Sequence, residues 1–240
     1  MTGTGTIRFS ATSHVGRVRK INEDSILALP EQKIWVVSDG MGGHAAGDFA
    51  SQTVVDAIAM LPNDLLPGDL MRALRLAIHR AHDLILAEAQ SRDVGLIGAT
   101  VVVLMLTDGH FVAFWAGDSR LYRLRGGKIE MLSTDHSLVA ELVASGQLSW
   151  DEAEHHPQSN AITRAVGVGD VLELDKIRGE VERGDRFLLC SDGLTKYATF
   201  ATLLRLVEKA PIETVADNLL QMALHAGGGD NISIIVVDVD

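Results

Sequence analysis

Several aspartates in this chain stand beside glycine at the ends of apolar segments. The apolar segment 34–37 runs into Ser38-Asp39-Gly40, and the same order recurs at Ser191-Asp192-Gly193. A reversed form, Gly229-Asp230-Asn231, precedes the apolar segment 232–239. Glycine permits the tight or left-handed turns that leave a side chain at the end of a strand. If these ends meet, their carboxylates repel one another, and a bound cation is the usual way to hold them together.

The acids with this placement form a candidate set of metal ligands. Carboxylate oxygens are hard ligands that suit Mg²⁺, Mn²⁺ or Ca²⁺, and the chain has no Cys or His spacing of the zinc type. Taken singly, each acid can also be read as an ordinary turn-forming residue. The repeated pairing with glycine favours a shared site made from Glu23, Asp24, Asp39, Asp118, Asp192 and Asp230.

Three further side chains are candidates for contact with a substrate. Arg19 lies five residues before Asp24, and a guanidinium beside a carboxylate–metal cluster is suited to bidentate binding of phosphate. His44 and His136 are candidates for a general acid or a substrate contact, with a structural role as the alternative for each. The stretch 40–43 lacks the Gly-Lys-Ser/Thr of a P-loop and the spacing of a dinucleotide fingerprint, so both of those readings are rejected.

Composition narrows the class of protein. The chain has 240 residues, 47% of them hydrophobic, and a formal net charge of −11, which argues against non-specific binding to nucleic acid or anionic lipid. Its one cysteine, Cys190, excludes an intrachain disulfide framework and suits a reducing compartment. No apolar run approaches the ~18–20 residues of a membrane span, and the N-terminus is unlike a secretory signal. We therefore expect a soluble cytoplasmic protein.

Apolar periodicity and turn residues predict an α+β domain in which strands outnumber helices. No linker or repeat interrupts the pattern. Strands are expected over about 7–14, 25–29, 33–38, 100–106, 111–116, 121–125, 128–132, 171–178, 186–190 and 232–239. Helices are expected over about 49–61, 70–91, 137–144, 150–156, 200–209 and 213–225.

Taken together, the motifs resemble those of the metal-dependent serine/threonine protein phosphatases of the PP2C (PPM) family, in their short bacterial stand-alone form. The matching segments run in family order from about residue 8 to 238, and their combination is far more specific than any one of them. They are Arg19-Lys20-Ile21-Asn22-Glu23-Asp24, Ser38-Asp39-Gly40-Met41-Gly42-Gly43-His44, Gly98-Ala99-Thr100, Gly117-Asp118-Ser119-Arg120, Asp135-His136-Ser137, the segment 160–167, Ser191-Asp192-Gly193-Leu194 and Gly229-Asp230-Asn231.

The resemblance implies a four-layer α-β-β-α sandwich, with two antiparallel sheets flanked by helix pairs and metals in a cleft at one end. It implies that residues 1–240 form a single catalytic domain with a mobile flap at about 140–165. By the same resemblance, two Mn²⁺ or Mg²⁺ ions are bridged by Asp39 and contacted by the carbonyl of Gly40. The other implied ligands are Glu23, Asp24, Asp192 and Asp230, and Asp118 with Asp192 resembles the site of a third, weaker ion.

The implied activity is hydrolysis of phosphoserine and phosphothreonine on proteins, by a hydroxide bridging the two ions. Arg19 is the implied phosphate-binding residue and acts with the metals on the phosphoryl oxygens. Met41 stands where eukaryotic members carry His, and bacterial members commonly have Met there. A metal-bound water is therefore the first candidate for the general acid, and His44 is the second.

The implied partners are phosphoproteins and a cognate bacterial Ser/Thr kinase, without nucleic acid or membrane, and the expected state is a monomer. Short members of this kind also occur beside type VI secretion systems. Two alternatives remain at this point. One is a non-catalytic metal-binding or scaffold relative, which the complete acid set disfavours. The other is a phosphatase of an anti-sigma-factor antagonist, a class that usually carries sensor domains.

Overall fold

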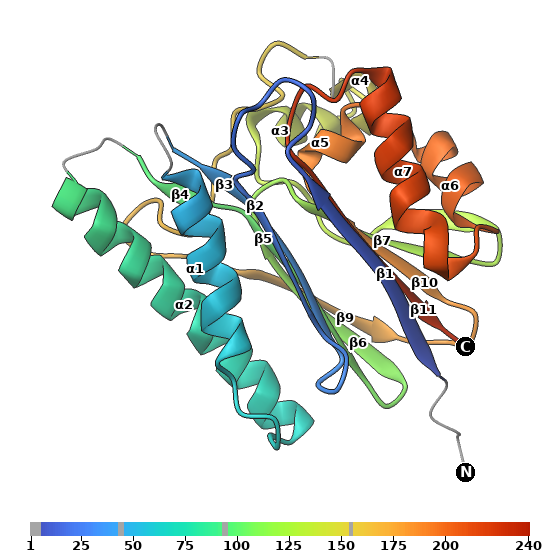
Figure 1. The fold of residues 1–240 in the computed structure, drawn as a ribbon, viewed down its shortest axis with the longest axis horizontal. Coiled ribbons are helices and arrows are strands. Elements are labelled where there is room, and N and C mark those ends of the chain that lie inside the picture. Colours follow the sequence, from blue (N-terminus) through green and yellow to red (C-terminus); the bar gives the residue numbers. More distant parts are fainter. Residues whose placement is uncertain (1–5, 43–45, 93–95, 154–155) are drawn as a thin grey trace.

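The computed structural model describes residues 6–42, 46–92, 96–153 and 156–240, and its framework is two antiparallel sheets lying face to face (Figure 1). One sheet has five strands, and its edge strands come from the start and the middle of the chain. In spatial order they are β1 (Ile7–His14), β11 (Ile232–Val239), β10 (Arg186–Cys190), β7 (Arg120–Arg125) and β8 (Lys128–Met131).

The second sheet contains the other strands, and one of them carries the first aspartate–glycine motif, Asp39-Gly40, near its end. Its main order is β2 (Asp24–Leu29), β3 (Ile34–Met41), β5 (Val101–Thr107), β6 (His110–Ala116) and β9 (Asp175–Glu180). A two-residue strand, β4 (Gly98–Ala99), pairs with the end of β3. Residues 34–38 of β3 are buried, which is why this strand reads as a continuous apolar run and not as an alternating one.

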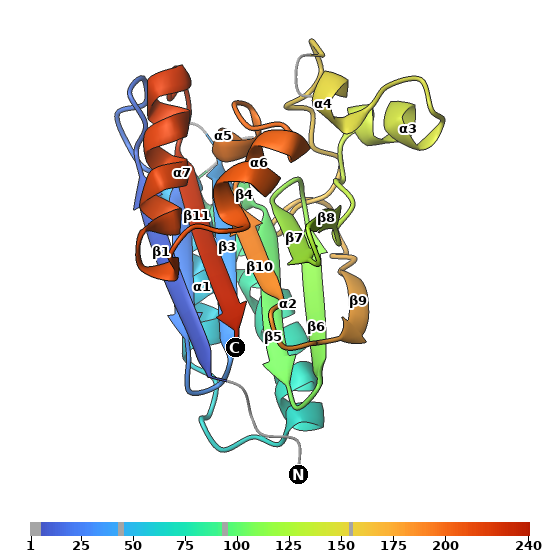
Figure 2. The same ribbon diagram turned by 90° about the vertical axis from the view of Figure 1, so that its right-hand side faces the viewer.

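Helices cover the outer face of each sheet. The pair α1 (Gly47–Ala59) and α2 (Pro67–Arg92) packs on the six-stranded sheet, and α6 (Phe200–Val207) and α7 (Ile212–Ala226) pack on the other (Figure 2). Three short helices, α3 (Leu138–Ala144), α4 (Trp150–Ala153) and α5 (Asp192–Thr195), gather at one end of the sandwich. The predicted α-β-β-α sandwich is confirmed.

Three apolar cores hold the four layers together. Trp35, Phe111 and Phe187 lie in the core between the two sheets, where each is at most 1% exposed. The other two cores lie between each sheet and its helices. Burial of large apolar side chains on both faces fixes the spacing of the sheets, so the strand ends are held rigidly where the acids emerge.

The strand predicted at about 171–178 was wrong in its bounds. It corresponds to β9, which spans Asp175–Glu180, because Leu172 and Leu174 are buried in the core between the six-stranded sheet and its helices without joining the sheet. The helix expected at about 150–156 is described over Trp150–Ala153, and the next two residues lie outside the described ranges. The short elements α5 and β4 were not predicted, since two to four residues are too few to show a period.

None of the helices in the described part of the chain combines the length and apolarity that a membrane crossing requires.

Candidate active site

Two of the predicted acids face each other across the β2–β3 hairpin. Asp24 opens β2 and is the antiparallel partner of Asp39 near the end of β3. Side chains of directly opposed residues lie on the same face of a sheet, and like charges there repel. The hairpin therefore places an unfavourable pair of carboxylates at the end of the sandwich where α3, α4 and α5 also lie.

Hydroxyl groups hold the backbone around Asp39. Its N–H donates to Oγ1 of Thr100 at 3.0 Å, and the Thr100 N–H donates back to the Asp39 carbonyl at 2.8 Å. Thr100 Oγ1 also lies 2.6 Å from Oγ of Ser119, which directly follows Asp118. This chain of contacts ties the Asp39 backbone to the Asp118 turn, so the two acids are positioned together.

Burial and mutual repulsion act on the titration of these acids. Burial, followed by the nearby carboxylates of Asp24, Asp192, Asp118 and Asp230, raises the pKa of Asp39 well above its usual value. Burial and Asp192 likewise raise the pKa of Asp118. For Asp24, burial raises the pKa to about 7, although Ser191 donates a 2.8 Å hydrogen bond to its Oδ2. The acids predicted from separate segments thus influence one another as a cluster.

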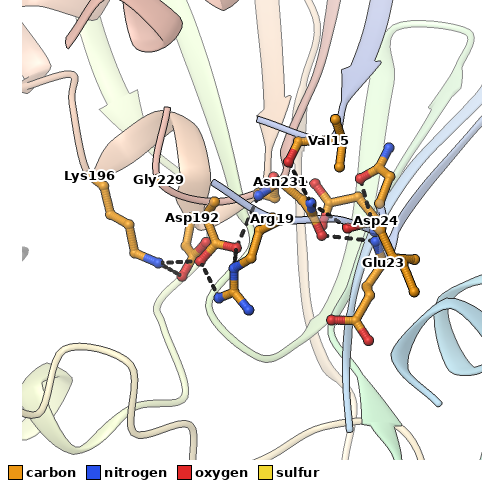
Figure 3. A network of polar contacts seen from close by, with 12 residues as sticks. Val15, Arg19, Glu23, Asp24, Asp192, Lys196, Gly229 and Asn231 are labelled. Carbon is orange, nitrogen blue, oxygen red and sulfur yellow. Dashed lines mark hydrogen bonds and ion pairs between the residues drawn. The ribbon is translucent and has the colours of Figure 1, made fainter. Parts of the chain in front are cut away.

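Asn231 fastens the loop that carries the first acidic motif. Its side-chain N–H groups donate to the carbonyls of Val15 and Ile21, at 2.9 and 3.0 Å, and its Oδ1 accepts from the Glu23 N–H at 2.8 Å (Figure 3). The loop between β1 and β2 is therefore held against the turn before β11. This single side chain joins the Arg19–Asp24 motif to the Asp230 motif.

The glycines of the β3 turn allow close backbone approach. A Cβ on Gly40 would lie 2.0 Å from the Gly47 carbonyl oxygen and 2.6 Å from that of Glu23. The Gly40 N–H donates to the Glu23 carbonyl at 3.0 Å, and the Gly47 backbone binds the Glu23 carboxylate. Glycine is required at this contact because any side chain would separate Glu23 from the end of β3.

Two cations stand among the acids of the opposite sheet. Arg19 Nε lies 2.9 Å from Oδ1 of Asp230, and Lys196 Nζ lies 3.0 Å from Oδ2 of the same residue. Lys196 Nζ also lies 2.7 Å from Oδ2 of Asp192 (Figure 3). Burial opposes ionisation of Asp230, but Lys196 and Arg19 outweigh it and lower the pKa of that carboxyl.

The chemistry of this donor set fits divalent cations. Asp24 Oδ1 and Asp118 Oδ1 are buried and have no hydrogen-bond partner, and unpaired buried carboxylate oxygens are costly unless a cation binds them. Within the residues that the structure describes, no three His, Cys, Asp or Glu side chains are arranged to hold an ion as they stand. Asp192 and Asp230 instead face Lys196 and Arg19.

The structure describes only one of the two histidines predicted as candidate general acids. His44 lies outside the described residues. His136 is held inside the protein: its Nδ1 accepts from the Gly117 N–H at 3.1 Å and its Nε2 lies 3.3 Å from Asp175 Oδ2. Burial lowers the pKa of His136, and its ring stacks on Trp115. These contacts support the structural reading of His136, which holds the backbone just before Asp118.

Sequence reasoning missed several residues that shape the site. Lys196 carried a usable signal, because it follows Asp192 by four residues and such a pair shares one face of a helix. Thr100, Ser191 and Asn231 stood inside quoted motifs, but their roles depend on contacts between distant segments. The buried ion pair of Arg120 and Asp135 next to Asp118 was missed for the same reason.

Comparison with known proteins places this arrangement in a family. Residues 12–229 match the family model described as protein phosphatase 2C. The serine/threonine protein phosphatase PstP of Mycobacterium tuberculosis is 36% identical over 97% of this chain. The chain spans 45% of the length of that relative.

Two solved structures share the whole fold. PppA, described as a key regulatory component of T6SS in Pseudomonas aeruginosa, is 42% identical, with a TM-score of 0.92 and 99% of both chains covered. The catalytic domain of PstP in complex with two manganese ions is 35% identical, with a TM-score of 0.88 over 98% of this chain and 99% of that one. Sequence, fold and the acid cluster agree, and the chain belongs to the protein phosphatase 2C family.

Proposed function

We propose that this chain is a metal-dependent phosphatase that removes phosphate from serine and threonine side chains of proteins. The observation that carries the proposal is the convergence of Asp24, Asp39, Asp118, Asp192 and Asp230 at one end of the sandwich. Arg19 stands at their edge, paired with Asp230. The two manganese ions bound by the PstP catalytic domain, a protein of the same fold, support divalent cations as the cofactor.

Asp39 is the proposed bridging ligand, with Glu23, Asp24, Asp192, Asp230 and the Gly40 carbonyl as the others, and Asp118 with Asp192 as a third, weaker site. When bound, two divalent cations supply a water of lowered pKa as the nucleophile and charge that balances the phosphate. The carboxylates hold that charge at the end of the sandwich. No residue of the chain needs to form a phosphoenzyme, which agrees with the complete burial of Cys190.

Arg19 is the residue proposed to hold the phosphate. Its side chain is 51% exposed while it binds Asp230, so its N–H groups can reach a substrate without leaving the site. It lies on an exposed stretch, residues 17–21, which is basic in an otherwise acidic protein. This local charge favours the approach of a phosphorylated segment.

The leaving serine or threonine oxygen needs a proton. Met41, whose side chain reaches Gly98, has no proton to donate, and His44 is the protein side chain that we propose as a general acid.

Replacement of Arg19 by Ala is expected to lower kcat/KM about 10- to 100-fold, because hydrogen bonds to a charged group contribute about 1.5–3 kcal/mol. The measurement is steady-state phosphate release from a phosphothreonine peptide. Arg17→Ala is the matched control, since Arg17 is exposed on the same stretch and makes no ion pair with a residue that the structure describes. Equal losses in both variants would show that the stretch contributes only general positive charge.

The test of the function itself is phosphate release from the same peptide in Mn²⁺, in Mg²⁺ and in EDTA. We expect turnover with either ion and none in EDTA. Folded protein that releases no phosphate with either metal would overturn the proposal and favour a phosphoprotein-binding scaffold.

The proposed partners are phosphoproteins and the Ser/Thr kinase that modifies them. The 42% identity to PppA makes regulation of a type VI secretion system the first pathway to test.

We further propose that residues 1–240 act as one catalytic domain, with a flap at about 140–165. Ser159 and Asn160 of that segment line a small cavity together with Asp118, Asp192 and Lys196, which supports its place beside the acids.

A further inference from the structure

Lys196 places its ammonium group between two of the proposed metal ligands. It directly follows the short helix α5, whose first residue is Asp192, and its ammonium group contacts both Asp192 and Asp230, at 2.7 and 3.0 Å. These two acids come from different segments, one after β10 and the other before β11. The Lys196 side chain, 23% exposed, spans the gap between them (Figure 3).

The Lys196 ammonium group lies between two carboxylates. Its Nζ lies within hydrogen-bond distance of one oxygen of each of two carboxylates, Asp192 and Asp230, and their negative charge favours the ammonium form. Arg19 also binds Asp230: its Nε lies 2.9 Å from Oδ1, and its Nη2 donates to Oδ2 at 3.0 Å. The carboxylates of Asp192 and Asp230 are thus paired with cationic side chains of the chain itself. By contrast, Asp24 Oδ1 and Asp118 Oδ1 have no hydrogen-bond partner.

We propose that Lys196 is a competing internal cation, which must leave the carboxylates of Asp192 and Asp230 before a divalent ion binds there. The inference rests on the proposed function, in which these acids are ligands. An ammonium group and a metal ion seek the same carboxylate lone pairs and repel each other, so both cannot occupy the same oxygens.

A small cavity beside Lys196 leads to a further acid. Lys196 lines the small cavity that also contains Asp118 and Asp135, and a lysine side chain has four methylene groups that allow it to turn. A move toward Asp118, which is proposed only for the third, weaker ion, would keep the charge near the acids while freeing Asp192 and Asp230 for the other two ions. Lys196 therefore lowers the affinity for metal and stabilises the clustered carboxylates when no metal is bound.

The test compares Mn²⁺ binding by the wild-type protein and by Lys196→Met, which keeps the apolar stem and removes the charge. Calorimetric titration is expected to show at least tenfold tighter binding in the variant, a change of about 1.4 kcal/mol. Thermal unfolding in EDTA is expected at a lower temperature in the variant, and saturating Mn²⁺ is expected to raise its Tm by more than it raises that of the wild type.

Lys209→Met is the matched control, because Lys209 is exposed and makes no ion pair with any residue in the described ranges. It is expected to bind Mn²⁺ as the wild type does. Lys196→Gln, a second neutral variant, replaces Lys196→Met should that protein not fold, and the same tightening is expected. If the wild type binds Mn²⁺ and the neutral variants bind it equally well or more weakly, the inference about Lys196 is overturned and the proposed function is not. A wild-type protein that binds no Mn²⁺ would overturn the proposed function as well.

Discussion

Replacing Asp39 by Asn is expected to lower kcat/KM for a phosphothreonine peptide by about a thousandfold or more. Metal ions contribute several kcal/mol of transition-state stabilisation, and a loss of about 4 kcal/mol corresponds to that factor. Asp39 lies opposite Asp24 and near the other acids, and on this ground we propose it as the carboxylate that two ions share. An amide has nearly the same size but lacks the negative charge that this role requires.

Phosphate release at saturating Mn²⁺ measures this effect. Asp108→Asn is the matched control, because Asp108 is an 85% exposed acid in the β5–β6 turn, paired only with Lys33 among the described residues. The control is expected to keep wild-type activity. An Asp39→Asn protein that retains more than about a tenth of the activity, a loss of less than about 1.4 kcal/mol, would contradict the bridging role.

The same substitution is expected to stabilise the protein in EDTA. Burial and the neighbouring carboxylates raise the pKa of Asp39, so the folded state binds its proton more tightly than the unfolded state. Wild-type stability in EDTA therefore falls as pH rises from the usual carboxyl range toward neutrality. Asp39→Asn removes one contributor, so its free energy of unfolding at neutral pH is higher and its pH dependence is shallower. Denaturant titrations at several pH values measure both effects and separate lost chemistry from lost folding.

The acid cluster could be predicted from sequence because its signals are local. Asp39, Asp192 and Asp230 each adjoin glycine at the end of an apolar segment, and the structure brings them close enough for Asp192 and Asp230 to raise the pKa of Asp39. The motif resemblance then supplied the order of the segments and the fold. The need for glycine at residue 40 is explained by a contact between residues seven apart: a Cβ on Gly40 would lie only 2.0 Å from the Gly47 carbonyl oxygen.

The remaining features depend on contacts that no local pattern encodes. Asn231 binds Val15 and Ile21, more than two hundred residues away, so its role follows from the pairing of β1 with β11. The bounds of β9 were wrong because its register is set by pairing with β6 and not by its own apolar residues. The cations that balance the acids were missed because sequence reasoning sought ligands and not their competitors.

Removal of Arg120 is expected to have the largest effect on stability. Its Nε and Nη2 groups donate to both oxygens of Asp135 at 2.6–3.0 Å, and the two side chains are only 6% and 4% exposed. Burial raises the pKa of Asp135 even though Arg120 opposes that rise, so the carboxylate depends on its partner to stay charged. Arg120→Met is expected to cost about 3–5 kcal/mol, the range for breaking one side of a buried ion pair.

The double variant Arg120→Met/Asp135→Asn provides the decisive comparison. Loss of the charge at residue 135 removes the unpaired buried carboxylate, so the double variant is expected to recover more than half of the lost stability. Denaturant unfolding of the wild type, both single variants and the double variant gives the coupling energy directly. The fluorescence of Trp150, whose ring centroid lies 4.9 Å from the Arg120 guanidinium carbon, is expected to change in Arg120→Met, because the cation over the ring is lost. A double variant less stable than Arg120→Met would contradict the ion pair as the cause, and would assign the cost to lost packing of the long Arg120 side chain instead.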